Sequence, residues 1–279
     1  MPDKIKNFWN VALLISAEML LSLVLLAIAI SALVFLMRKQ LRKYKYIDLA
    51  IFKNLQAYTT PERNRLMLFF TLLGKHQFLI PANLVLIFYF LFISRQSWFS
   101  IRVAAIALSS LALMFLLKYI FKRKRPLAPL LQAVKGLSFP SGHAIMAVTF
   151  YGLIIYILFH TVKHEELNYF FTAVLVVLIL LIGFSRIYLR VHYASDVVAG
   201  FIIGILWLSI SLTVLAKMEN FFSRTEIEES FSSFIVKNIR SIVRIFLFAT
   251  FFIFLRQIIP VNLVFLSIQR FPYFRFAMS

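Results

Sequence analysis

The apolar residues of the chain are gathered into long runs separated by short polar stretches. A helix needs about 20 apolar residues to cross roughly 30 Å of hydrocarbon, and several runs approach or exceed this length. They cover residues 10–37, 78–93, 101–121, 139–160, 167–184 and 194–216, and the second extends backwards through 66–74. The pattern predicts an all-α fold, a polytopic membrane helix bundle with about six transmembrane helices.

Two further stretches have the character of helices that lie in the membrane interface. Residues 47–58 predict a short interfacial helix. The apolar stretch 245–255 is too short to cross a bilayer. We expect an interfacial or re-entrant helix there, with a tilted seventh span as the alternative. The expected organisation is a first span with its basic flank (1–45), a core with spans two to six (46–217) and a tail (218–279).

The composition is typical of a membrane protein and indicates which kinds of partner the chain can bind. Hydrophobic residues make up 62% of the chain and charged residues 15%, against roughly 45–50% and 25% in soluble domains. The formal net charge of +19 suits cationic loops that meet anionic lipid head groups. We therefore expect a bilayer as partner and no nucleic acid. The absence of cysteine excludes thiolate chemistry.

The acidic residues are as informative as the basic ones. No Asp or Glu occurs between residues 63 and 164, so a carboxylate-bridged metal pair is excluded from that region. We expect no metal and no other cofactor, and a site there would act on an anion. Glu18 lies within the first apolar run, where we expect a structural hydrogen bond rather than a contact with substrate.

Three polar clusters interrupt the apolar pattern. They are KYIFKRKRP (118–126), SFPSGH (138–143) and SRIYLRVHYASD (185–196). Taken singly, they could be an interface flank, a turn before a helix and a structural histidine–aspartate pair. Because successive spans alternate in direction, however, all three face the same compartment. Ionisable groups near a membrane interior are costly, so together they predict a functional site.

The residue types in these clusters suit the binding of phosphate. Lys118 and Arg125 are seven positions apart, which would place them on one helix face about 10 Å apart if Pro126 ends that helix. With Arg186 they supply fixed positive charge that can grip phosphate oxygens. Ser141 and Gly142 are expected at a helix N-terminus, where free backbone amides favour an anion.

The two histidines and the remaining carboxylate suit proton and group transfer. Asp196 follows His192 by one helical turn and can hold its ring in one tautomer. So oriented, His192 is a candidate nucleophile on phosphorus. His143 has no acid near it in the sequence, which leaves it as the candidate general acid.

The three clusters resemble, in order, the signature K-x6-RP, PSGH and SR-x5-H-x3-D of the type 2 phosphatidic acid phosphatase superfamily. This superfamily includes lipid phosphate phosphatases and is related to vanadium haloperoxidases. The resemblance covers roughly residues 45 to 217, and every fixed position of the signature is present. One small departure is Ala194, where bacterial members often have proline.

The resemblance implies an integral membrane phosphatase that acts on lipid phosphates without a metal. It implies that Lys118, Arg125, Ser141, Gly142 and Arg186 bind phosphate. It further implies that His192 forms a phosphohistidine, that Asp196 orients it, and that His143 protonates the leaving group and later activates water. Phosphatidic acid, phosphatidylglycerol phosphate and a polyprenyl diphosphate all remain candidate substrates. A lipid phosphotransferase with an alcohol acceptor and a catalytically silent phospholipid-binding protein are the alternatives.

The family and the positive-inside rule disagree about orientation. The resemblance implies a bacterial inner membrane with the site facing the periplasm or exterior. The basic cluster at residues 38–45 lies on the same side as the site, against Lys4 and Lys6 at the N-terminus, and the rule would place that side in the cytoplasm. We follow the family, and the sequence predicts no oligomeric state.

Overall fold

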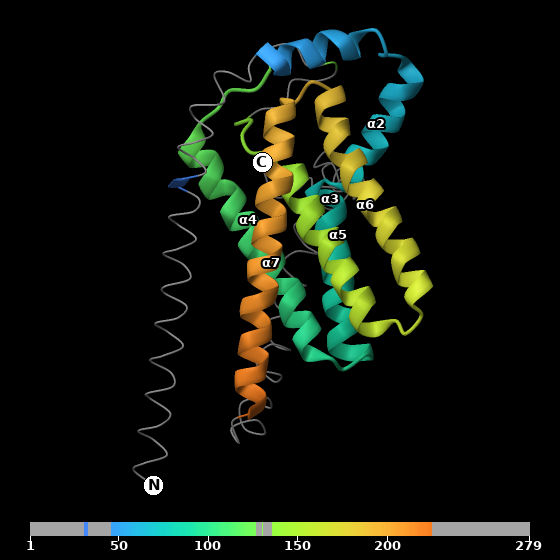
Figure 1. The fold of residues 1–279 in the computed structure, drawn as a ribbon, viewed down its shortest axis with the longest axis vertical. Coiled ribbons are helices and arrows are strands. Elements are labelled where there is room, and N and C mark those ends of the chain that lie inside the picture. The colour runs from blue at the N-terminus through green and yellow to red at the C-terminus, as the bar shows by residue number, and fades with distance from the viewer. Residues whose placement is uncertain (1–30, 33–45, 127–129, 131–135, 225–279) are drawn as a thin grey trace, which may run out of the picture.

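The computed structural model describes residues 31–32, 46–126, 130 and 136–224 (Figure 1). Within those residues the chain is helical and contains no strand, which confirms the all-α prediction. The expected first span lies outside the described residues except for 31–32, so Glu18 and the basic cluster at 38–45 are not placed. The stretch 245–255 and most of the tail also lie outside them.

Five helical segments of the described part are long and apolar enough to cross a membrane. They correspond to predicted spans two to six, with ends shifted by a few residues. The first is α3 (His76–Phe88) continued by the π-helical turn η1 (Tyr89–Ile93). The others are α4 (Ser97–Phe121), α5 (Gly142–Thr161), α6 (Glu165–Tyr188) and α7 (Ala194–Arg224).

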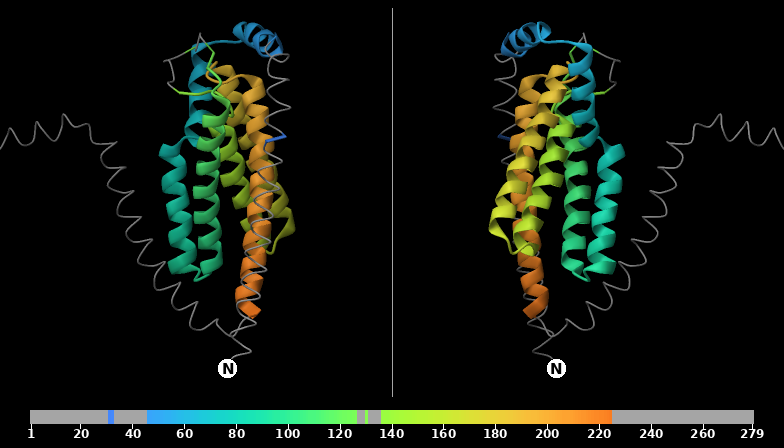
Figure 2. Two further views of the ribbon diagram at one scale, coloured as in Figure 1. Left: turned by 90° about the vertical axis from the view of Figure 1, so that its left-hand side faces the viewer. Right: turned by 90° about the vertical axis from the view of Figure 1, so that its right-hand side faces the viewer.

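The predicted interfacial helix is present and covers residues 46–56. It lies across the end of the bundle, at the top of Figure 1, rather than along the bundle axis, and the two views of Figure 2 agree. Its exposed face carries apolar side chains such as Ile47 and Leu49, as expected of a helix that rests in the interface.

The expected backward extension of the second span into residues 66–74 is wrong. These residues belong to a separate helix, α2 (Pro61–Leu73), which begins at the N-cap Thr60 and has proline in its first turn. The chain then breaks at Gly74 and Lys75 before α3 begins. Gly74 and the polar residues Lys75, His76 and Gln77 mark this break in the sequence, but the prediction joins the apolar runs on either side of them into one span.

Packing against two neighbouring helices accounts for the break. A Cβ atom on Gly74 would lie 2.6 Å from Ile182 Cγ2 and 3.2 Å from His143 Cδ2, so only glycine allows the backbone to pass this close. The Tyr151 hydroxyl donates to the Leu73 carbonyl at 3.0 Å, which satisfies one acceptor freed at the end of α2. The break therefore places the backbone of residue 74 directly against His143.

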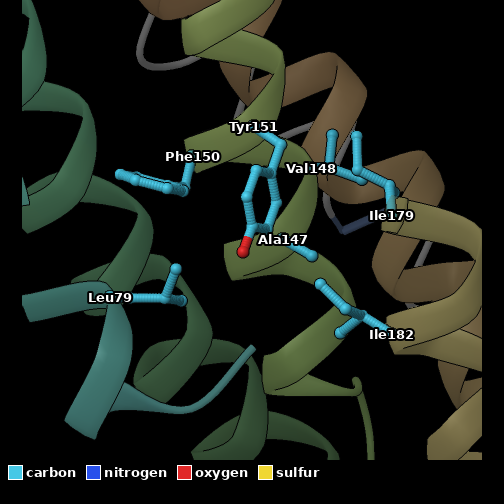
Figure 3. Packing of buried hydrophobic residues seen from close by; sticks show 7 residues of the cluster. All are labelled: Leu79, Ala147, Val148, Phe150, Tyr151, Ile179 and Ile182. Atoms are coloured by element: carbon cyan, nitrogen blue, oxygen red, sulfur yellow. The ribbon is translucent and has the colours of Figure 1, made fainter. Parts of the chain in front are cut away.

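Helix α5 is central to the bundle and packs against α4, α6 and α7. Figure 3 shows part of its core, where Ala147, Val148 and Tyr151 meet Leu79 of α3 and Ile182 of α6. The approach to α7 is closer still, since a Cβ on Gly200 would lie 2.8 Å from Ala144 Cβ and 2.9 Å from the Ser141 carbonyl oxygen. Small residues at such crossings let membrane helices pack closely.

Candidate active site

The three polar clusters meet at the end of the bundle that the interfacial helix covers. Backbone hydrogen bonds tie them together: Ser138 N–H donates to the Arg123 carbonyl at 2.8 Å and Ser141 N–H to the Asp196 carbonyl at 3.0 Å. The Arg125 side chain donates to the Val191 carbonyl at 2.9 Å. The prediction that the clusters share one side of the membrane is therefore confirmed for the described part of the chain.

The predicted helical relation between Lys118 and Arg125 is wrong. Helix α4 ends at Phe121, and Lys122 takes a left-handed conformation with φ of 48° that terminates it. Pro126 therefore does not end the helix, and Arg125 lies beyond it. Left-handed residues commonly close helices, but glycine is their usual type, so a lysine gave no signal of this ending.

Both cations nevertheless reach the site, each held by backbone carbonyl groups. The Lys118 ammonium donates to the Leu137 carbonyl at 2.8 Å. Besides its bond to Val191, Arg125 donates to the Gly136 carbonyl at 3.3 Å, and its Nη1 lies 3.2 Å from His192 Nε2. Burial lowers the pKa of Arg125 from its usual value, and the charge of Asp196 opposes that effect.

Ser141 and Gly142 lie at the start of α5, as predicted, with Ser141 as the N-cap. The Ser141 hydroxyl does not cap the helix; its buried oxygen has no hydrogen-bond partner in the described residues. A Cβ on Gly142 would lie 2.4 Å from Met114 Sδ and 3.9 Å from Lys118 Cε. Glycine thus allows the helix start to lie against Met114 of α4. An unpaired buried hydroxyl requires an explanation.

Arg186 lies in the last turn of α6 with its side chain buried. Its Nη1 donates to the Thr71 hydroxyl at 3.2 Å, while its buried Nε has no partner among the residues described. Thr71 also shares a 2.7 Å hydrogen bond with Ser185. Sequence reasoning missed Thr71, for which the only signal was a polar residue inside an apolar run.

His192 and Asp196 form the predicted pair. Asp196 lies in the first turn of α7 and His192 lies two residues before that helix, so the expected helical turn between them is not formed. His192 Nδ1 lies 3.7 Å from Asp196 Oδ2, and both side chains are almost fully buried. The same carboxylate oxygen accepts hydrogen bonds from the Ser138 hydroxyl and, at 3.0 Å, from Tyr193 N–H. With an acceptor facing Nδ1 and the Arg125 donor facing Nε2, the neutral ring carries its proton on Nδ1.

Burial governs the protonation of His192. It lowers the pKa of the ring to about 4, and the charges of Arg125 and Arg186 lower it further, whereas the hydrogen bond that the ring donates to Asp196 raises it. The ring is therefore neutral near pH 7, and the lone pair of Nε2 faces the Arg125 guanidinium.

His143 lies in the first turn of α5, where its buried Nε2 has no hydrogen-bond partner among the described residues. The positive charges that act on its ring are those of Arg186, Arg125 and Lys75, together with His192. Lys75 was not singled out from the sequence. It is brought to the site by the break between α2 and α3.

A second network beside the histidines was also missed. Asp48 of the interfacial helix is 1% exposed and binds Arg123 and Ser195. Arg123 in turn pairs with Asp196. The described residues contain no group of three or more His, Cys, Asp or Glu side chains that could hold a metal ion.

Comparison with known proteins identifies the family. A family model described as the PAP2 superfamily matches residues 98–219. The chain is 35% identical over 164 residues to phosphatidylglycerophosphatase B of Bacillus subtilis (strain 168), covering 57% of this chain and 78% of that protein. The chain belongs to the PAP2 superfamily. The resemblance drawn from the three motifs is therefore confirmed, and the PAP2 phosphatases are hydrolases that act on lipid phosphates.

Two further likenesses agree with this PAP2 membership. A crystal structure of a transmembrane PAP2-type phosphatidylglycerolphosphate phosphatase from Bacillus subtilis is similar with a TM-score of 0.58 and 30% identity, covering 63% of this chain and 87% of that one. Lipid phosphate phosphatase delta of Arabidopsis thaliana is 32% identical over 94 residues, which are 33% of this chain and 23% of that protein.

The lowered pKa of His192 predicts how stability depends on pH. As pH falls, the unfolded chain binds a proton at this residue near pH 6.5, but the folded protein does so only near pH 4. The stability linked to His192 is thus fully present above pH 6.5 and is lost between 6.5 and 4, by at most about 3 kcal/mol. We expect the Tm of the wild type in detergent to fall more between pH 7.5 and 4.5 than that of His192→Gln. Equal falls in Tm for the two proteins would contradict the lowered pKa of His192.

Proposed function

We propose that this PAP2 protein is an integral membrane phosphatase that removes the terminal phosphate of a lipid phosphate or diphosphate through a phosphohistidine, without a metal. The observation that carries the proposal is the state of His192. Its ring is neutral, with Nδ1 directed at Asp196 and Nε2 at Arg125. A histidine held in this way presents a nucleophilic nitrogen to an anion bound by the arginine.

The surrounding cations form the proposed phosphate cradle. Lys118, Arg125 and Arg186 each act electrostatically on at least one of the others. We assign the unpaired Ser141 hydroxyl and the unpaired Arg186 Nε to phosphate oxygens, along with the Gly142 N–H at the helix start. Such preorganised donors stabilise the charge on the equatorial oxygens of the transition state.

Two steps then complete the reaction. His192 Nε2 attacks phosphorus, and the bond from phosphorus to the lipid oxygen breaks. His143, which holds a proton once the negative charge of the bound phosphate offsets the nearby cations, gives that proton to the leaving oxygen. His143 next takes a proton from water as the water attacks phosphorus. The nitrogen–phosphorus bond breaks, and inorganic phosphate leaves. In both steps Asp196 holds the His192 ring and stabilises the positive charge that develops on it.

Lys75 favours substrates whose leaving group carries a second negative charge. It is partly buried and follows the glycine that lies against His143, the proposed acid for the leaving group. Phosphatidylglycerol phosphate and a polyprenyl diphosphate both leave a phosphate-bearing product, whereas phosphatidic acid leaves a neutral diacylglycerol. We therefore rank the first two above phosphatidic acid. The name of the Bacillus subtilis relative, phosphatidylglycerophosphatase B, agrees with the first.

Loss of the nucleophile tests the activity. We expect purified wild type in detergent to release phosphate from at least one of these lipids, with EDTA present, and vanadate to inhibit by mimicking the five-coordinate phosphorus. His192→Ala should abolish release because no phosphohistidine can form. His164→Ala, an exposed histidine at the far end of the bundle, is the matched control.

Several outcomes would refute the proposal. Substantial activity in His192→Ala would refute the nucleophile, and activity lost in EDTA would refute the metal-free reaction. Transfer of phosphate to an added alcohol, in place of its release, would indicate a lipid phosphotransferase. Lipid binding without any turnover would indicate a catalytically silent phospholipid-binding protein.

A change at Lys75 tests the ranking of substrates. Lys75→Met should lower kcat/KM for a polyprenyl diphosphate about tenfold more than for phosphatidic acid, because only the former leaves an anion beside the lysine. Lys75→Arg should keep the difference between the lipids. Lys53→Met removes an exposed cation from the interfacial helix and serves as the control. An equal loss on both lipids would show that Lys75 only anchors the chain in the interface.

We further propose that the site faces the periplasm or exterior of a bacterial inner membrane. Because the chain has no natural cysteine, single cysteines report orientation directly. Exposed Lys124 follows the end of α4, and exposed Lys163 lies between α5 and α6 at the opposite end of the bundle. An impermeant thiol reagent should label Lys124→Cys in intact cells and Lys163→Cys only after the membrane is broken. The reverse pattern would place the site in the cytoplasm.

A further inference from the structure

Asp48 is an unusual residue for an interfacial helix. Its neighbours Ile47 and Leu49 are 47% and 51% exposed, whereas the Asp48 residue is 1% exposed. Buried carboxylates persist in proteins where they are paired and hydrogen-bonded. Asp48 is therefore directed into the end of the bundle and bound there, while the rest of its turn faces outward.

Two of the three side-chain hydrogen bonds of Asp48 come from Ser195 at the start of α7. Its Oδ1 accepts a hydrogen bond from Ser195 N–H at 3.0 Å, and its Oδ2 accepts one from the Ser195 hydroxyl at 2.7 Å. Oδ2 also accepts a hydrogen bond from Arg123 Nη2 at 2.9 Å. Asp48 thus holds the residue that immediately precedes Asp196.

Arg123 continues the network from Asp48 to Asp196. Its Nη1 donates to Asp196 Oδ1 at 2.5 Å and to the Ser195 hydroxyl at 2.8 Å. Its guanidinium lies 4.2 Å from the centre of the Tyr193 ring, and that ring stacks on Phe52 of the interfacial helix. The planar fork of an arginine suits a bridge between two carboxylates, for which a lysine would be a poor substitute.

The bridge determines both the position and the charge of Asp196. Arg123 holds Oδ1, so Oδ2 is left to accept from Ser138 and Tyr193 and to face His192. If Arg123 were paired only with Asp196, the two charges would cancel and no net negative charge would act on His192. Asp48 supplies a second negative charge, so the group of two carboxylates and one guanidinium keeps a net charge of −1.

We propose that Asp48 and Arg123 are positioning residues for the reaction, which set the orientation and the effective charge of Asp196 and through it the reactivity of His192. The inference rests on the proposed function and extends it to the interfacial helix. That helix carries a part of the catalytic machinery, in addition to resting on the bilayer.

The first test removes the charge of Asp48 while keeping its shape. Asp48→Asn should lower kcat by about 10- to 100-fold, in line with the loss of a charge-assisted hydrogen-bond partner. KM should change little, because Asp48 is not part of the phosphate cradle. In single-turnover experiments the formation of the phosphoenzyme should slow by the same factor. Glu62→Gln, an exposed carboxylate in the first turn of α2, is the matched control and should retain the wild-type kcat.

The second test separates charge from simple structural support. Arg123→Gln combined with Asp48→Asn restores the net charge of −1 through Asp196 alone. We expect the double variant to recover at least threefold in kcat over Asp48→Asn, with Tm measured for every protein. A merely structural network would instead give a double variant no better than the single one. Where Asp48→Asn does not fold, Ser195→Ala removes only the hydroxyl that both residues bind and should lower kcat by about three- to tenfold.

The outcomes separate this inference from the proposed function. If the wild type releases no phosphate, the proposed function fails. If the wild type is active and His192→Ala is not, but Asp48→Asn matches Glu62→Gln in kcat, the positioning role alone is overturned. A double variant without recovery would overturn the charge argument in the same way.

Discussion

Mutual repulsion among Lys118, Arg125 and Arg186 is the physical constraint on which the rest of the site depends. These cations lie close enough to act on one another at the end of a membrane bundle. Among the described residues, their hydrogen bonds go to neutral partners, namely backbone carbonyls, the His192 ring and the Thr71 hydroxyl. Their positive charge is therefore not neutralised by direct carboxylate pairing, which suits a cradle for a phosphate that carries negative charge itself.

Arg123 stands apart from these three cations although it belongs to the same cluster, 118–126, as Lys118 and Arg125. It is paired with two buried carboxylates, Asp48 and Asp196, so its charge is used inside the protein. Neighbouring basic residues thus have different roles, because Arg123 faces carboxylates and the other cations face neutral groups. The interfacial helix contributes to the pairing of Arg123, since it supplies Asp48 and the Phe52 ring that stacks on Tyr193.

Much of the fold and the site could be predicted from the sequence because the governing signals are local. Long apolar runs indicate spans, and alternation of spans indicates which ends share a side. The spacing of four positions indicates that His192 and Asp196 form a pair, although His192 lies before α7 begins. Errors arose where tertiary contacts override local pattern. The apolar stretch 66–74 breaks from α3 because α6 and His143 pack against Gly74, and α4 ends at Phe121 because Lys122 adopts a left-handed conformation.

The sequence by itself determined the membrane class, the side shared by the three clusters, and the family, because hydropathy and motif spacing are properties of neighbouring residues. Only the tertiary structure decided which charges are paired and which remain free. Asp48 and Ser195 are 147 positions apart, and no periodicity links residues at that distance. Burial, which makes His192 neutral and leaves Ser141 without a partner, exists only once the helices have packed together.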